Sequence, residues 1–176
     1  LLTNRLAEAA VIQTTARSIL EEGLAYDRCQ VGVVTDMDGY EALADHDVLE
    51  QAKMRRVMRT QIDVVLSEGA GVLNADIEQV AELAELCDGE VILYTTDAHN
   101  GFVATHRQNT EIHHEGGRAV LVKGNNVVLA TGAQERVLGS LDALSLPGGK
   151  RPDTPALLAA VAIAWAMDIA PDLIGA

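Results

Sequence analysis

The sequence predicts an α/β protein whose mostly parallel sheet is flanked by helices and extended by an antiparallel hairpin. Short apolar runs alternate with segments of helical periodicity up to residue 95, a pattern typical of parallel sheets. Beyond that point, two apolar runs are separated only by Gly124 and Asn125, a pair that favours a tight hairpin turn. The chain has 176 residues, so we expect one domain over residues 1–176 with its own apolar core.

The first part of the chain is expected to contain four strands and three helices. The strands are apolar throughout, as strands covered on both faces must be, and are predicted at residues 9–13, 29–35, 70–74 and 90–95. A short helix after the first strand ends at Gly23, a residue suited to a helix C-cap. Apolar residues at near-helical spacing predict a long helix over 47–66, with an interruption near Asp63, and another helix over 77–87.

The second part of the chain carries the hairpin and a final helix. The hairpin strands are predicted at 118–123 and 126–131, whereas segment 134–144 is too weakly patterned for an assignment. Asp153 is the expected N-cap of a helix from residue 154 to about 168, which is apolar on nearly every face and should be buried. Because the chain begins with Leu1 and stops where a further element could begin, we expect it to be a piece of a longer protein.

Composition excludes several classes of partner. The formal net charge of −13 repels nucleic-acid phosphates and anionic membranes, so neither partner is expected. The longest apolar stretch, residues 156–167, is too short to span a bilayer. The two cysteines show no metal-ligand spacing and no signal peptide precedes them, which favours a cytoplasmic location.

Some polar clusters carry residue types suited to chemistry, and each has a structural alternative. Asp36 and Asp38 follow a predicted strand, where open α/β sheets bind ligands, so they could ligate magnesium; polar capping of the strand end is the favoured alternative. Asp45 and His46 could serve as a general base or metal ligand, although helix capping explains them better.

Three further clusters are weaker candidates. The cations of the long helix could hold an anion or form a solvated face paired with acids: Lys53, Arg55, Arg56 and Arg59. The loop at 148–150 is a poor phosphate cradle because the strand and the Ser or Thr of a GxxxxGK[ST] loop are missing. The adjacent His113 and His114 seldom would converge on one metal ion.

The order of three segments is more informative than any single cluster. GLAYDRCQVGVVTD (residues 23–36) is followed by VLEQ (48–51) and then by GVLNAD (71–76). This series resembles the cyanophycin synthetase family, in which a GLAYDRC or GLAFDRC segment, a valine-rich strand and a VLNADD element occur in the central domain of a Mur ligase-like module. The resemblance covers essentially the whole chain and implies a partial Mur ligase-like central domain.

The resemblance implies ATP-dependent amide-bond formation, in which a carboxylate is activated as an acyl phosphate and then attacked by an amine. In the family, an amino-terminal ATP-grasp half adds aspartate to the polymer backbone and the Mur-like half adds arginine to the aspartate side chain. ATP and Mg²⁺ are the cofactors. The implied partners are the ATP-grasp and carboxyl-terminal ligase domains of the same parent chain, in a homo-oligomer.

The resemblance also assigns roles to three residues. Asn74 and Asp76, from the VLNAD element, are expected to contact the adenine end of ATP, and Gln13 stands where the family places a magnesium-binding Glu. The chain departs from the family elsewhere, because Tyr40 aligns with a metal-associated His and the phosphate loop would lie ahead of Leu1. We therefore expect an ATP-dependent ligase fragment that is inactive by itself. The alternative is a non-catalytic scaffold or oligomerisation domain that supports the ATP-grasp half.

Overall fold

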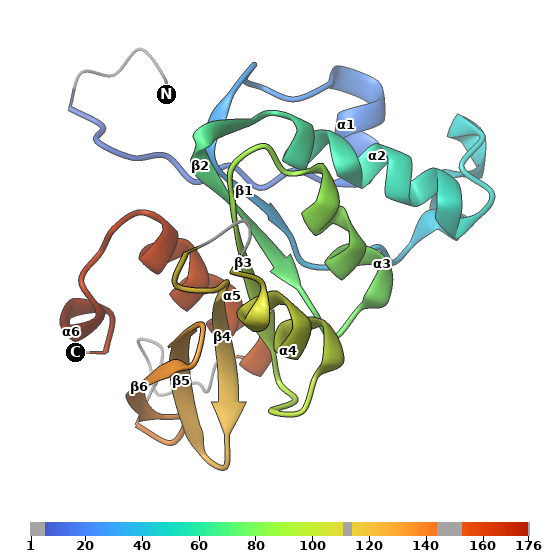
Figure 1. Ribbon diagram of the computed structural model, residues 1–176. Helices are drawn as coiled ribbons and strands as arrows, with labels where there is room; N and C mark the ends of the chain where they lie inside the picture. The colour runs from blue at the N-terminus through green and yellow to red at the C-terminus, as the bar shows by residue number, and fades with distance from the viewer. Residues whose placement is uncertain (1–5, 111–113, 144–152, 176) are drawn as a thin grey trace.

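A six-stranded mixed sheet forms the centre of the computed structural model, which describes residues 6–110, 114–143 and 153–175 (Figure 1). The strands are β1 (Cys29–Val34), β2 (Val65–Asn74), β3 (Glu90–Thr95), β4 (Arg118–Lys123), β5 (Asn126–Thr131) and β6 (Gln134–Ser140), and they lie side by side in that order. Strands β1 to β4 pair in parallel, whereas β5 and β6 are antiparallel additions. The predicted α/β class, with a parallel sheet and an antiparallel appendix, is confirmed.

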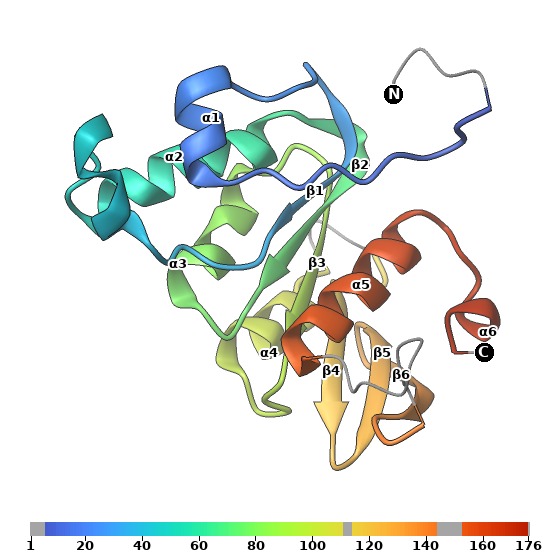
Figure 2. The ribbon, with the colours of Figure 1, turned by 180° about the vertical axis from the view of Figure 1, so that it is seen from behind.

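Helices cover both faces of this sheet. They are α1 (Ala16–Glu22), η1 (Tyr40–His46), α2 (Gln51–Asp63), α3 (Glu78–Ala81), η2 (Glu82–Leu86), α4 (Gly101–Gln108), α5 (Thr154–Ala166) and α6 (Pro171–Ile174). Helix α5 packs on one face, against Val72, Ile92 and Val120, while α2, α3 and α4 cover the other (Figures 1 and 2). Because neighbouring strand residues point to opposite faces, Leu73 joins the second layer. Both faces are therefore buried, which explains the continuous apolar strands.

Arg118 connects α5 to the sheet. Its guanidinium lies 3.9 Å from the centroid of the Trp165 ring and donates to the Trp165 carbonyl oxygen at 2.9 Å. It also forms an ion pair with Glu90 at 2.7 Å. One β4 side chain thus holds the neighbouring strand and the carboxyl-terminal turn of α5 together.

The predicted strand at 9–13 is wrong. This segment runs past β1 towards α1 without forming a strand, and its Val11 side chain is 84% exposed (Figure 2). An apolar run forms a buried strand only where a neighbouring strand pairs with its backbone and another layer packs on its side chains. Within the described residues, β1 pairs with β2 alone, so this segment has neither.

Other boundaries differ from the sequence analysis because tertiary pairing overrides helical periodicity. The long predicted helix begins only at Gln51, after the separate turn η1, and stops at Asp63, where an interruption was expected. The chain then enters β2 at Val65, five residues before the predicted strand, because Val65 is buried and pairs with Cys29. The helix predicted at 77–87 is two short pieces, α3 and η2.

The carboxyl-terminal half matches its predictions more closely. Strands β4 and β5 have the predicted bounds, and Gly124 takes the positive φ of 61° that the turn requires. Segment 134–144, left unassigned, contains β6, whose residues are mostly exposed and so lack a clear apolar pattern. Asp153 occupies the N-cap position of α5, but its side chain makes no capping hydrogen bond within the described chain.

Candidate functional site

Asn74 ends β2 and fixes the carboxyl edge of the parallel strands. It is 6% exposed, and its Nδ2 donates to the Thr35 carbonyl oxygen, just beyond β1, at 2.9 Å. Its Oδ1 accepts from the backbone N–H of Asp76 at 3.0 Å. Both ends of the buried amide are therefore used within the fold, where they hold the ends of β1 and β2 in place.

Asp76 is exposed and connects the same edge to β3. Its carboxylate accepts from the Thr95 hydroxyl, from the Thr96 backbone N–H at 2.9 Å and from the Thr96 hydroxyl at 2.6 Å. Asn100, which caps α4, donates to the Ala75 carbonyl oxygen at 2.8 Å. The residues after β2 are thus bonded to the residues that follow β1 and β3, and the carboxylate of Asp76 reaches solvent from this network.

Two carboxylates at this edge, Asp36 and Asp76, lie near the buried Tyr94 ring. Burial raises the pKa of the Tyr94 phenol, and the neighbouring charges of Asp36 and Asp76 raise it further. Because both carboxylates act on one ring from different strand ends, the edge concentrates negative charge above β1, β2 and β3.

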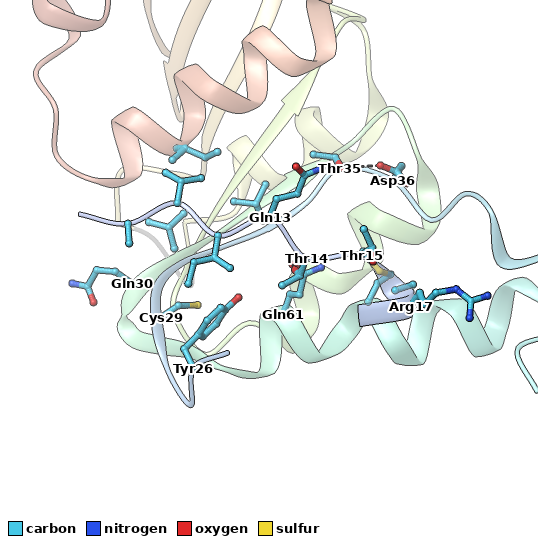
Figure 3. Close-up of a pocket in the computed structure, with 18 of the residues that line it drawn as sticks. Gln13, Thr14, Thr15, Arg17, Tyr26, Cys29, Gln30, Thr35, Asp36 and Gln61 are labelled. Carbon is cyan, nitrogen blue, oxygen red and sulfur yellow. Dashed lines mark hydrogen bonds between the residues drawn. The ribbon is translucent and has the colours of Figure 1, made fainter. Parts of the chain in front are cut away.

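Gln13 lies in a groove beside β1. We call this the β1 groove: it has a volume of about 890 Å³ and is bounded by segment 8–17, the β1 segment from Arg28 to Asp36, η1, and Ile163 and Met167 near the end of α5. In Figure 3 the Gln13 side chain points towards Thr35, next to Asp36. Since the Thr35 carbonyl accepts from Asn74, the structure brings all three predicted site residues to the same edge of the sheet.

The ligand set at this edge does not fit a complete magnesium site. Gln13 supplies an uncharged amide oxygen in place of a carboxylate, and Asp36 already accepts from the Thr35 hydroxyl at 2.8 Å and the Asp38 N–H at 3.3 Å. Among the residues that the structure describes, no group of three or more His, Cys, Asp or Glu side chains could hold a metal ion. We therefore derive no chemical step through a metal in this chain.

Three of the four cations of α2 form ion pairs. Lys53 pairs with Asp47 at 2.7 Å, Arg55 with Glu82 at 3.4 Å and Arg59 with Asp63 at 2.9 Å. This supports the solvated, acid-paired face over an anion site. His113 and the loop at 148–150 lie outside the described residues.

Sequence reasoning missed Thr95, Thr96 and Arg17. Thr95 is the last residue of β3 and Thr96 follows it, so their position at a strand end was the available signal, but their partner Asp76 is 19 to 20 residues away along the chain. Arg17 binds Asp45, 28 residues away, and nothing in the local pattern indicates this pair.

Comparison with known proteins supports the resemblance found in the sequence. The chain is 32% identical over 127 residues to the cyanophycin synthetase of Crocosphaera subtropica, covering 70% of this chain and 14% of that protein. It is also 32% identical over 128 residues to the cyanophycin synthetase of Synechocystis sp., covering 71% and 14%. The resemblance to the cyanophycin synthetases is confirmed.

The similarity concerns one segment of those relatives. The chain spans about 14% of the length of the cyanophycin synthetases of Crocosphaera subtropica, Synechocystis sp. and Nostoc sp.. No family model matches the chain. Among the described residues, no helix is both long and apolar enough to cross a membrane.

Proposed function

We propose that this chain is the Mur ligase-like central segment of a cyanophycin synthetase-like, ATP-dependent amide ligase. The observation that carries the proposal is the gathering of Gln13, Asn74 and Asp76 at the carboxyl edge of the parallel strands, where open α/β sheets bind ligands. The sequence similarity to cyanophycin synthetases supports it. In the parent protein, ATP would supply the phosphoryl group that activates a carboxylate for attack by an amine.

The residues at this edge would contribute in different ways. Asp76 is exposed and charged, so it would meet the adenine end of the nucleotide directly. Asn74 is buried and hydrogen-bonded at both ends of its amide, so it would hold the Thr35 and Asp76 backbones at the right spacing. Gln13 would mark the metal position of the family without bringing charge to it.

We propose that the chain is inactive by itself. Its sequence contains no GxxxxGK[ST] loop, and the carboxyl edge offers an incomplete set of metal ligands. The phosphate loop, the ATP-grasp half and the carboxyl-terminal ligase domain would come from the rest of the parent chain.

A second candidate function is a non-catalytic scaffold for the ATP-grasp half. It is favoured by one observation, that the Asp76 carboxylate already accepts three hydrogen bonds from the end of β3. In this reading the polar residues at the edge serve only to hold strand ends together.

Substitution in the full-length parent separates the two functions. Asp76→Ala should lower arginine incorporation into the polymer by about tenfold, the effect of losing a charge-assisted hydrogen bond, and leave aspartate incorporation unchanged. Asp88→Ala, just before β3 at the opposite end of the strand, is the control and should change neither. Equal effects of Asp76→Ala on both amino acids, or no effect on either, would favour the scaffold.

A further inference from the structure

Four side chains lie between α1 and η1 at the border of the β1 groove, which Arg17 lines. Arg17 and Glu21 come from α1, and Asp45 and His46 from η1; together we call them the α1–η1 clasp. Nη1 of Arg17 lies 2.8 Å from Oδ2 of Asp45, and Nη2 lies 3.1 Å from Oδ1. This bidentate geometry uses the planar fork of the guanidinium, which a lysine cannot reproduce.

The same guanidinium also holds the backbone of η1. Its Nη2 donates to the Ala42 carbonyl oxygen at 2.7 Å, and its Nη1 donates to Glu21 at 3.1 Å. Nε2 of His46 lies 3.3 Å from Oε1 of Glu21. Arg17 lowers the pKa of both Asp45 and Glu21, because its guanidinium donates hydrogen bonds to both carboxylates.

The segment η1 is held differently at its two ends. It is flanked by Gly39, with φ of 79°, and Asp47, with φ of 59°, both in the left-handed region. Lys53 secures Asp47 through its carbonyl and carboxylate oxygens, each at 2.7 Å, whereas nothing lies within 4 Å of the position where Gly39 would carry a Cβ. Lys53 therefore fixes the Asp47 end of η1, whereas the chain at Gly39 has room to move.

The position of η1 determines one wall of the β1 groove. Gly39, Ala42 and Leu43 all line the groove, and the Leu43 side chain is 4% exposed. Because Arg17 binds the Ala42 carbonyl oxygen, the clasp connects α1 directly to a residue of this wall.

We propose that the α1–η1 clasp is a latch that holds η1 against the β1 groove, and that releasing Arg17 lets the Gly39 end of η1 move away from the groove while the sheet stays folded. This inference is independent of the proposed function, because it concerns how this chain controls access to its own groove.

Amide hydrogen exchange on the 176-residue chain tests the latch. Three amides report on η1: those of Ala42, Asp47 and Val48, which donate to Gly39, Ala44 and Leu43 at 3.1, 3.1 and 3.2 Å. Arg17→Met should speed their exchange by about threefold or more, the effect expected from losing an exposed ion-pair network, and leave the β2 amide of Val72 unchanged. Arg59→Met is the matched control, since Arg59 is an exposed arginine whose partner Asp63 lies on its own helix.

Asp45→Asn tests the latch at the partner of Arg17, because it removes the charge of the side chain and leaves its size almost unchanged. It should speed the same three amides in the same direction. Unchanged exchange in both Arg17→Met and Asp45→Asn would overturn the proposal, as would an equal acceleration at Val72, which would mean global destabilisation. If Arg17→Met does not fold, the Asp45→Asn result alone decides.

Salt provides a second readout. The clasp is solvent-exposed, so raising the ionic strength should speed exchange of the η1 amides in the wild-type chain. In Arg17→Met the salt effect should disappear. The same salt dependence in both proteins would contradict a latch made by Arg17.

Discussion

Asp76 shows how one carboxylate at a strand end can hold the neighbouring strand. Its carboxylate oxygens accept hydrogen bonds from the hydroxyl groups of Thr95 and Thr96. Thr95 is completely buried. A buried hydroxyl that loses its acceptor is left partly unsatisfied, which costs more than the bond itself contributes. The side chain that we propose to meet the nucleotide is therefore also part of the fold.

Replacement of Asp76 should destabilise the isolated chain. We expect Asp76→Ala to lower the free energy of unfolding by about 1–2 kcal/mol, because the Thr95 hydroxyl and the Thr96 amide lose an ionised acceptor. Urea denaturation followed by the fluorescence of Trp165, the single tryptophan, measures this. Asp88→Ala should stay within about 0.5 kcal/mol of wild type. Equal stabilities of the two variants would show that the network at β3 contributes nothing.

Among residues, sequence reasoning finds positions better than contacts. Asn74 and Asp76 could be placed at a sheet edge because they directly follow an apolar run, and the structure has them there. Their partners Thr35 and Thr95 could not be inferred, since each pair joins residues far apart in the chain. The same limitation hid the pair of Arg17 and Asp45.

Among elements, Gly32 in β1 shows why α2 can approach the sheet so closely. A Cβ at this position would lie 2.4 Å from the Gln61 carbonyl oxygen and 2.6 Å from a Val65 methyl group. The first of these neighbours is backbone, which cannot move aside without shifting α2. The lone glycine among the valines of β1 thus marks a close helix-to-strand contact.

The stability of Gly32→Ala should show whether this contact matters more than the ordinary preference of strands for alanine over glycine. We expect a loss of about 1–3 kcal/mol of stability, because the added methyl forces β1 and α2 apart. Gly139→Ala in β6 is the control, since nothing lies within 4 Å of its Cβ position, and it should be neutral or slightly stabilising. Urea denaturation of both variants measures the difference. A Gly32→Ala protein as stable as Gly139→Ala would contradict the close packing of α2.

Elements were predictable where their partners are local. The β4 and β5 strands match their predicted bounds because the turn at Gly124 sets their pairing within a few residues. The prediction of a strand at 9–13 was wrong because an apolar segment forms a strand only where a neighbouring strand pairs with it. The start of β2 was missed because Val65 pairs with Cys29 of β1, and a helical pattern in the sequence cannot reveal that pairing.

At the scale of the molecule, acidic residues outnumber basic ones, 26 to 13, and protonation of the carboxylates that form ion pairs makes the stability depend on pH in acid. Lys123 lowers the pKa of Glu135, and Arg107 lowers it further. Arg17 lowers the pKa values of Glu21 and Asp45. A carboxyl group with a depressed pKa stabilises the folded state above its ordinary pKa. That contribution is lost as the pH falls through the folded value.

We therefore expect stability to fall as the pH drops below about 4.5, the ordinary pKa of glutamate. In Glu135→Gln the loss between about pH 5 and pH 3 should be smaller, because one group that must be protonated is gone. Glu78→Gln, at the start of α3, is the control and should follow the wild-type curve. Thermal denaturation across this range measures all three proteins. Parallel curves for Glu135→Gln and wild type would contradict the role of the Glu135 ion pairs.

The most direct test of the whole account is binding of ATP and magnesium to the full-length parent protein, with its ATP-grasp half inactivated so that only the Mur-like half responds. Calorimetry should show binding in the micromolar range that requires magnesium and that Asp76→Ala, but not Asp88→Ala, weakens. Absence of binding would contradict the ligase assignment and leave this segment as a scaffold.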